Sequence, residues 1–278
     1  MGCCKIELRG KNVLVTGGAM GMGKSMAGLF LKEGARVAIV DIREAELAAA
    51  TKELAPSGQI AAYVCDISDK WNIYSLAEKL KKEFGTIDIL VNNAGVVRSA
   101  PFLQKTDEVI EKLIAVNLMS IFWTTKAFLP DMVSKGEGVI VNMASAGGLL
   151  GVPYISDYCA SKFAVVGLTE SLRQEMALAG QKKIKFIYVC PNTVSTGMFE
   201  GAQAVKGTRM LTPEDVTVKI IEGIKNGRAM IGVPSSVYTL PLVKAILPIG
   251  AMDFLCRVLG IATSSKNMTG RKDSIILR

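Results

Sequence analysis

Tyr158 and Lys162 lie four residues apart in the segment DYCASK, residues 157–162. On a helix, this spacing places the phenol and the ammonium group on one face, one turn apart. A phenol titrates near pKa ~10, and a neighbouring cation favours its ionised form. The pair could therefore pass a proton to or from an alcohol near neutral pH. The spacing alone is weak support, because such a pair is more often a packed ring and a solvated amine.

The composition narrows the chemistry available for such a transfer. The chain has 278 residues, half of them hydrophobic, which is enough for the core of a sizeable α/β protein. It contains no histidine, which excludes Ser-His and Cys-His nucleophile pairs and all histidine metal sites. We predict no metal, and proton transfer must then use Tyr, Lys, Asp, Glu, Cys or water.

The cysteines and the N-terminal sequence bear on the cellular compartment. Six cysteines occur without a C-x-x-C pair, and the first residues lack the charged-then-apolar pattern of a secretory signal. We therefore expect a reduced, cytoplasmic protein. The N-terminal MGCC invites a lipid-acylation interpretation, but Ile6 stands where that motif has Ser or Thr, so we do not favour acylation.

Apolar, β-branched runs alternate along the chain with longer amphipathic segments. This alternation predicts an α/β fold, a doubly wound parallel sheet with helices on both faces. The predicted strands are 12–16, 36–40, 60–65, 87–91, 138–143, 185–189 and 229–233. The predicted helices are 21–32, 44–54, 69–84, 107–134, 158–179 and 213–225. Without a flexible linker or a repeat, we expect one domain: a catalytic part, 1–233, and a C-terminal extension, 234–278.

A glycine-rich segment, TGGAMGMG at residues 16–23, follows the first predicted strand and opens a helix. Glycines at this point let the backbone turn tightly and approach a pyrophosphate, whose charge then rests on amide N–H groups at the helix N-terminus. The segment predicts a dinucleotide site. Its expected members are Gly17, Met20, Gly21, Met22 and Gly23.

Two acidic residues follow the next two predicted strands. Asp41, with Ile42, lies about twenty residues past the glycines, where a carboxylate can accept hydrogen bonds from both adenine-ribose hydroxyls. Asp41 therefore favours NAD, and a 2′-phosphate would be repelled, although Arg43 leaves room for NADP as the less favoured cofactor. Asp66, with Ile67, follows the third strand and either binds the adenine amine or caps the next helix.

The TGxxxGxG spacing resembles that of the short-chain dehydrogenase/reductase family. Further motifs of that family follow in the same order over roughly residues 8–233. They are Asn92-Asn93-Ala94-Gly95 after the fourth strand, Asn117, Ser145 after the fifth strand, Tyr158 with Lys162, and PNTVST at 191–196, which is similar to the family's PGxVxT. Asn192 replaces the usual glycine, and asparagine is a residue that tolerates left-handed backbone well.

The resemblance implies a Rossmann fold and a role for each matching residue. Tyr158 would be the catalytic acid or base, Lys162 would lower its pKa and bind the nicotinamide ribose, Ser145 would orient the substrate oxygen, and Asn117 would hold a water in the proton path. The remaining implied cofactor contacts are Tyr158 itself, Asn93, Ala94, Gly95, Pro191, Val194 and Thr196. Because the family pairs two helical regions across subunits, the resemblance also implies a homodimer or homotetramer.

The expected substrate is a hydrophobic small molecule. Residues 146–154 are uncharged, and Val97, Met143, Met198 and Phe199 add further apolar candidates for the lining of its pocket. Residues 195–212 correspond to the family's mobile substrate lid. The tail from residue 247 to 271 resembles, more loosely, that of the retinol and hydroxysteroid dehydrogenase branch. We therefore predict reversible, NAD-dependent oxidation of a hydrophobic secondary alcohol: a hydroxysteroid, bile acid or retinoid-like alcohol.

Other functions on the same scaffold stay open. A 3-oxoacyl reductase or a polyol dehydrogenase has the same fold, so fold analogy does not exclude either. A more distant alternative is a non-catalytic NAD-binding regulator. Such regulators usually lose part of the catalytic tetrad, whereas Asn117, Ser145, Tyr158 and Lys162 are all present here.

The C-terminal extension is basic and apolar. The net charge is +8, and residues 228–278 hold seven Lys or Arg against two Asp. Basic residues do not alternate with aromatic ones as in nucleic-acid grooves, so we expect no nucleic-acid partner. Residues 229–243 are uncharged but interrupted by two prolines, and they are shorter than the ~20 residues that span a bilayer. Residues 242–262 predict one or two short helices, acting as a lid, a subunit contact or a peripheral membrane attachment.

Overall fold

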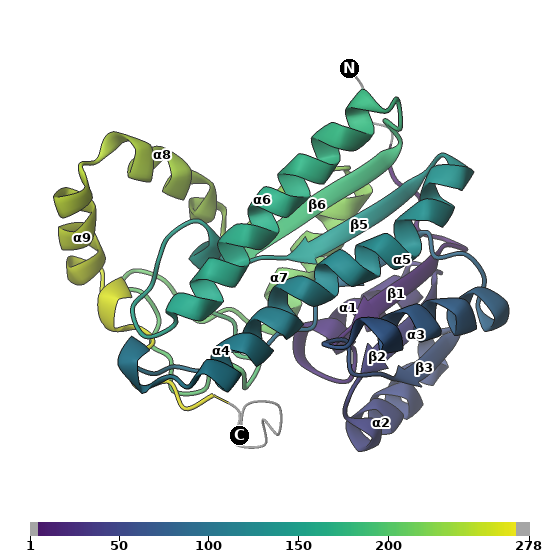
Figure 1. Ribbon diagram of the computed structural model, residues 1–278, viewed down its shortest axis with the longest axis horizontal. Helices are drawn as coiled ribbons and strands as arrows, with labels where there is room; N and C mark the ends of the chain where they lie inside the picture. The colour runs from purple at the N-terminus through teal and green to yellow at the C-terminus, as the bar shows by residue number, and fades with distance from the viewer. Residues whose placement is uncertain (1–4, 271–278) are drawn as a thin grey trace.

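Within the described residues, seven parallel strands form a single sheet in the order β3-β2-β1-β4-β5-β6-β7 (Figure 1). The computed structural model describes residues 5–270, so the N-terminal MGCC motif and the basic residues from 271 onward lie outside the described residues. The strands are β1 Asn12–Thr16, β2 Arg36–Asp41, β3 Ile60–Val64, β4 Ile89–Asn92, β5 Gly138–Met143, β6 Ile184–Pro191 and β7 Met230–Val233. The predicted doubly wound α/β fold is confirmed.

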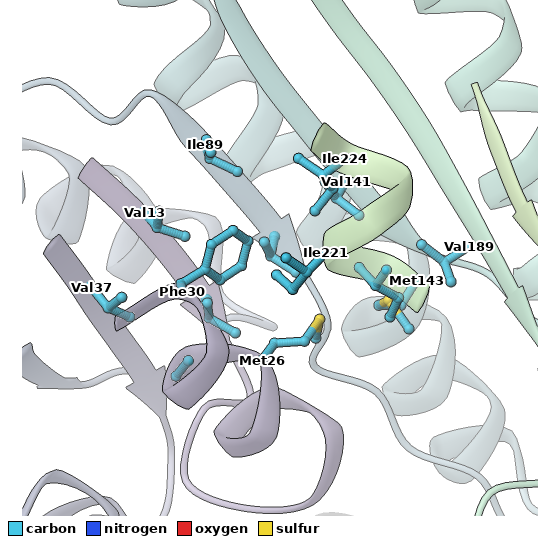
Figure 2. Close-up of a cluster of buried hydrophobic side chains, with 14 of the residues drawn as sticks. Val13, Met26, Phe30, Val37, Ile89, Val141, Met143, Val189, Ile221 and Ile224 are labelled. Carbon is cyan, nitrogen blue, oxygen red and sulfur yellow. The ribbon is translucent and has the colours of Figure 1, made fainter. Parts of the chain in front are cut away.

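Helices cover both faces of this sheet. One face carries α1 (Gly21–Lys32), α2 (Glu44–Leu54) and α7 (Pro213–Lys225), and the other carries α3 (Lys70–Glu83), α5 (Ser120–Lys135) and α6 (Ser156–Leu178). Figure 2 shows Met26 and Phe30 of α1 meeting Ile221 of α7 above the strands. Because apolar side chains lie on both sides of the sheet, the central strands β1, β4 and β5 are nearly continuous runs of buried residues, whereas the edge strand β3 buries Tyr63 alone.

The strand order reverses beside β1, which pairs with β2 on one side and with β4 on the other. In an open α/β sheet, the crevice at such a reversal lies beyond the carboxyl ends of the strands and is where ligands bind. The segments that follow β1, β2, β4 and β5 therefore meet at one edge of the sheet. These segments carry most of the residues singled out by the sequence.

The predicted helix 107–134 is interrupted by a π-helical turn. It consists of α4 (Asp107–Ile114), the π-helical turn Ala115–Met119 and α5. By length and composition alone, this 29-residue stretch could cross a membrane. Phe128 and Met132 on α5 are buried in the core beside the sheet, so it packs as a core helix of the fold.

The C-terminal extension forms two short helices, α8 (Leu240–Ile246) and α9 (Ile249–Val258), which project from the body as an arch (Figure 1). The chain then returns across residues 195–212. The backbone N–H of Lys206 donates to Leu259 O (3.0 Å), and that of Gln203 donates to Ser264 O (2.9 Å). The end of the extension thus holds the segment that we predicted to be the substrate lid.

Candidate active site

The glycine-rich loop packs tightly against the end of β4. Gly17 has a φ of +64°, and a Cβ atom there would lie 2.8 Å from the Cα of Ala94. A Cβ atom on Gly23 would lie 2.0 Å from the carbonyl oxygen of Gly17. The Asn93 side-chain amide donates to the carbonyls of Thr16 and Gly17 (2.9 and 3.1 Å). Only glycine allows this approach, which leaves the loop backbone close to a ligand at the N-terminus of α1.

A cavity opens beside this loop, at the carboxyl ends of β1, β2, β3 and β4, and we call it the nucleotide cavity. Most of the predicted cofactor residues line it: Gly17, Met20, Gly21, Met22, Asp41, Ile42, Asp66, Ile67, Asn93, Ala94, Gly95 and Thr196. Its lining runs from the glycine-rich loop to Asp66. This order of residues matches the order expected for a dinucleotide, with the phosphates at the loop and the ribose at Asp41.

Five predicted cofactor residues do not line this cavity, and two of them, Tyr158 and Lys162, lie on α6. Gly23 lies beneath the loop as a packing position, Pro191 ends β6, and Val194 is buried and bridges to Leu211. Sequence reasoning also missed residues that do line it: Val40, Cys65, Val96, Val116 and, as a cofactor neighbour, Met198. These side chains are apolar or sulfur-containing, and nothing in the sequence distinguishes them from core residues.

Asp41 presents a buried carboxylate to the nucleotide cavity. One oxygen accepts hydrogen bonds from the backbone N–H and the Nε of Arg43 (3.2 and 3.3 Å), and the other accepts from Ala19 N (3.3 Å). Arg43, which also lines the cavity, is therefore drawn toward Asp41. The negative charge at the end of β2 is partly balanced by this cation.

Asp66 is not the cap of the next helix. Asp69 caps α3 by accepting a hydrogen bond from Trp71 N (2.8 Å). Asp66 instead accepts hydrogen bonds from Ser68 and from Lys112 Nζ (3.1 Å). Burial opposes ionisation of Asp66, but these hydrogen bonds outweigh it and hold its pKa below the ordinary value. An ionised acceptor therefore faces the cavity where an adenine amine was expected.

The first turns of α6 bring Tyr158 and Lys162 together, as their spacing predicted. The Lys162 Nζ lies 5.6 Å from the centroid of the Tyr158 ring and donates to the carbonyl of Met143 (2.6 Å) at the end of β5. Ser145, just after β5, is hydrogen-bonded to the Tyr158 side chain. Both Tyr158 and Lys162 are buried. Three of the four predicted catalytic residues thus share one site where β5 meets α6.

Burial dominates the protonation of this pair. It raises the pKa of Tyr158, although the hydrogen bond with Ser145 acts in the opposite direction. Burial also lowers the pKa of Lys162 to about 8. The direction for Tyr158 is opposite to the lowering that we expected from Lys162, because loss of hydration disfavours the phenolate. At neutral pH the tyrosine of this site is a protonated acid.

Asn117 lies on the π-helical turn and is fully buried. Its side-chain oxygen accepts from Val96 N (2.7 Å), and its amide group donates to Val96 O (2.8 Å) and to the Ser161 hydroxyl (3.3 Å). The side chain therefore fastens the segment after β4 to α6, one residue away from Lys162. The sequence did not indicate that the side-chain oxygen and the side-chain nitrogen of Asn117 are both engaged in hydrogen bonds within the protein.

A second cavity, of about 260 Å³, adjoins the Tyr158 and Ser145 side chains, and we call it the substrate cavity. Its apolar walls come from three parts of the chain. They are Leu150, Val152 and Ile155 before α6, Phe199, Ala202 and Val205 in the predicted lid, and Val237, Leu240, Leu259 and Ile261 in the extension. Within the described part of the chain, Lys206 is the one charged residue in this lining. Uncharged polar side chains also line the cavity: Asn192, Thr193, Thr208, Ser236, Thr239, Ser264 and Ser265. Of the apolar candidates named from the sequence, Phe199 lines this cavity, while Val97 and Met143 line neither cavity.

Comparisons with known proteins agree with this geometry. A sequence model of the family described as short chain dehydrogenase matches residues 11–206. The chain is 37% identical over 271 residues to epidermal retinol dehydrogenase 2 of Mus musculus, covering 96% of this chain and 87% of that protein. It is 39% identical over 247 residues to estradiol 17-beta-dehydrogenase 11 of Mus musculus, covering 88% of this chain and 82% of that protein.

A solved structure is also similar over nearly its whole length. The crystal structure of a short chain dehydrogenase/reductase from Burkholderia phymatum in complex with NAD superposes with a TM-score of 0.79 at 26% identity, covering 90% of this chain and 96% of that chain. The family match extends over most of the chain and includes the glycine-rich loop, Ser145, Tyr158 and Lys162. The chain therefore belongs to the short-chain dehydrogenase family and is an oxidoreductase of the alcohol dehydrogenase type.

Proposed function

We propose that the protein uses NAD to interconvert a hydrophobic secondary alcohol and its ketone, with a hydroxysteroid or a retinoid-like alcohol as substrate. One observation carries this proposal: Tyr158 and Ser145 line a cavity whose wall is mostly apolar, with Lys206 as its one charged residue among the described residues. The apolar walls of such a cavity can bind a hydrophobic ring system, while the Tyr158 and Ser145 hydroxyls can hydrogen-bond to its single oxygen. The names of the relatives, a retinol dehydrogenase and an estradiol dehydrogenase, support the same substrate class.

In this proposal, the chain's own residues orient the alcohol and move its proton. Ser145 holds the substrate oxygen, and Tyr158 accepts the hydroxyl proton during oxidation or returns it during reduction. When bound, NAD supplies the hydride acceptor and, in its oxidised form, a positive charge that offsets the burial of the phenolate. The apolar walls exclude water from the reacting carbon.

We assign Lys162 and Asn117 to supporting roles. Lys162, held on the Met143 carbonyl, would bond the nicotinamide ribose, and its charged form would favour the ionised state of Tyr158. A pKa of about 8 lets Lys162 release or regain a proton near physiological pH. Asn117 would hold a water in the proton path, beside the Val96 and Ser161 contacts of its side chain.

NAD is the proposed cofactor, with NADP less favoured. The buried carboxylate of Asp41 lines the cavity, where it would accept hydrogen bonds from an adenine ribose and would repel a 2′-phosphate. Arg43, the nearby cation that could attract such a phosphate, already pairs with Asp41. The remaining proposed cofactor contacts are the glycine-rich loop, Asp66 and residues 93–95, together with Pro191 at the end of β6 and Val194 and Thr196 after it.

We propose that residues 195–212 act as the substrate lid and that residues 234–278 are part of the same domain. Phe199 and Val205 from the lid and Leu259 from the extension face the same substrate cavity. The glycines at 197, 201 and 207 all have positive φ, so the lid can hinge at several points.

We also propose that the protein is cytoplasmic and attaches peripherally to membranes through α8 and α9. Leu242, Ile246, Ile249 and Phe254 are exposed on these helices, and Lys244 and Arg257 lie among them. Exposed aliphatic side chains with interspersed cations are the pattern of an interfacial helix. Sedimentation with anionic liposomes at low and high salt tests this attachment, and failure to bind at low salt rejects it.

The proposed assembly is a homodimer or homotetramer that pairs α5 and α6 across subunits. Phe122 on α5 and Phe163 on α6 are both exposed in the single chain. Light scattering of the purified protein measures the mass in solution, and a monomer at micromolar concentration contradicts the assembly.

A screen of NAD reduction across hydroxysteroids, bile acids, retinol, acyl alcohols and polyols tests the substrate class. We expect the largest kcat/KM for a steroid or retinoid, since most of the cavity wall is apolar and a polyol would leave some of its hydroxyl groups unpaired there. Preferred turnover of a polyol or of a short acyl alcohol would refute this proposed substrate class.

A further inference from the structure

A buried ion pair lies directly before Tyr158. Lys105, at the end of the segment that links β4 to α4, donates a hydrogen bond to Asp157 in the first turn of α6. The two side chains are 0% and 2% exposed. Among the ion pairs found within residues 5–270, this is the one in which both partners are buried to that degree. Moving two charges out of water costs free energy, so we ask what this pair contributes at the start of α6.

Asp157 connects the pair to the backbone of Tyr158. The same carboxylate oxygen, Oδ1, accepts from Lys105 Nζ and from the backbone N–H of Tyr158 (2.9 Å). The other oxygen is buried and has no hydrogen-bond partner in the described part of the chain. The charge of Asp157 is therefore balanced by Lys105. Because Asp157 accepts a hydrogen bond from the backbone of Tyr158, a shift of Asp157 would also shift Tyr158.

Lys105 in turn is fixed to the segment after β4. Its Nζ also donates to the carbonyl of Arg98 (3.1 Å), and in the same segment Ala100 N donates to Tyr154 O (3.0 Å). Tyr154 is the one non-glycine residue between 5 and 270 with a positive φ, at 69°. The segment thus contacts both the first turn of α6 and the residues just before it, and it carries none of the four predicted catalytic residues.

We propose that Lys105 is a positioning residue for the reaction, acting through Asp157 to fix the first turn of α6 and with it the Tyr158 hydroxyl beside Ser145. This inference rests on the proposed role of Tyr158 as the acid or base. Proton transfer depends steeply on placement, and a displacement of about 1 Å can cost about a hundredfold in rate.

The test replaces the pair by apolar residues of similar size, Lys105→Met with Asp157→Leu, because Lys105→Met alone would strand a buried carboxylate and could unfold the protein. We expect the melting temperature and the affinity for NADH to stay near the wild-type values. We expect kcat to fall about tenfold to hundredfold, the loss that a misplaced catalytic group produces. Lys81→Met, which breaks the exposed pair with Asp131, is the control and should leave kcat unchanged.

A second arm separates positioning from a general structural effect. In a Tyr158→Phe background, the apolar pair should cause no further loss of the residual rate, since residues that act as a unit are not additive. The inference is overturned if the apolar pair keeps wild-type kcat, or if it causes the same loss with and without Tyr158. Failure of the proposed function is a different result: Tyr158→Phe alone would then keep wild-type turnover.

Discussion

Replacement of Gly23 by alanine tests whether the glycine-rich loop is held by close packing. A Cβ atom at this position would lie 2.0 Å from the carbonyl oxygen of Gly17 and 2.6 Å from Nδ2 of Asn93. The carbonyl is backbone and cannot rotate away, and Asn93 would lose a hydrogen bond to it. The substitution must therefore move the loop or the start of α1.

The expected cost follows from these contacts. Overpacking of this kind costs about 1–3 kcal/mol, and the lost Asn93 hydrogen bond about 1 kcal/mol. Against these losses, alanine in place of glycine inside a helix stabilises the folded protein by about 1 kcal/mol, because alanine has the higher helix propensity. The free energy of unfolding should fall by about 1–3 kcal/mol, since the last two effects offset each other. For a domain of this size, each kcal/mol lowers the melting temperature by about 2–4 °C.

The assay is thermal unfolding together with fluorescence titration of NADH. Gly167→Ala is the matched control, because a Cβ atom there meets nothing within 4 Å and the residue lies on an exposed part of α6. The control should be stabilised by up to about 1 kcal/mol and should bind NADH normally. Gly23→Ala should bind NADH about tenfold more weakly, or ~1.4 kcal/mol. If Gly23→Ala behaved as Gly167→Ala does, the packing argument would be wrong.

Three further predictions concern the site itself. Burial lowers the pKa of Lys162 from 10.5 to about 8, so between these pH values the unfolded chain binds a proton that the folded protein does not. The free energy of unfolding of the wild type, relative to that of Lys162→Met, should therefore rise with pH across this window. Unfolding at pH 7.5 and pH 10 measures this rise, and equal pH dependence of the two proteins would contradict the burial of a titrating amine. Asp41→Ala should move the kcat/KM ratio from NAD toward NADP because it removes the charge that repels a 2′-phosphate and frees Arg43; a wild type that prefers NADP would refute our assignment of Asp41. Ser145→Ala should lower kcat about a hundredfold, the typical loss for one hydrogen-bond donor that acts on a reacting oxygen, with NADH affinity retained; unchanged kcat would remove Ser145 from the site.

Much of the fold was predictable because the sheet is buried on both faces. Short β-branched runs such as Gly138–Met143 are bounded by turn residues, so the strands were placed to within a residue or two. The π-helical turn at Ala115–Met119 was not predictable, since Val116 and Leu118 continue a helical pattern. Asn117 on that turn accepts a hydrogen bond from Val96 N, a tertiary interaction with no local sequence pattern.

The candidate site also contains some residues that motifs located and others that only the folded structure brings together. Motifs located the nucleotide residues, because the glycine-rich loop and Asp41 are each tied to the end of a strand. The substrate cavity depends instead on Leu240, Leu259 and Ile261, which come from the extension and meet Phe199 only in the folded chain. The sequence could not supply the protonation state of Tyr158 either, since burial sets its pKa and burial is a property of the packed structure.

Tyr158→Phe tests the central claim most directly. This substitution removes one buried hydroxyl and keeps the ring that packs against Phe199. We predict that NAD-linked turnover of the best alcohol falls by about 10²–10⁴-fold, the contribution of a general acid or base. NADH affinity and melting temperature should stay near wild type. Turnover at the wild-type rate would contradict the account, because the proton would then have another path.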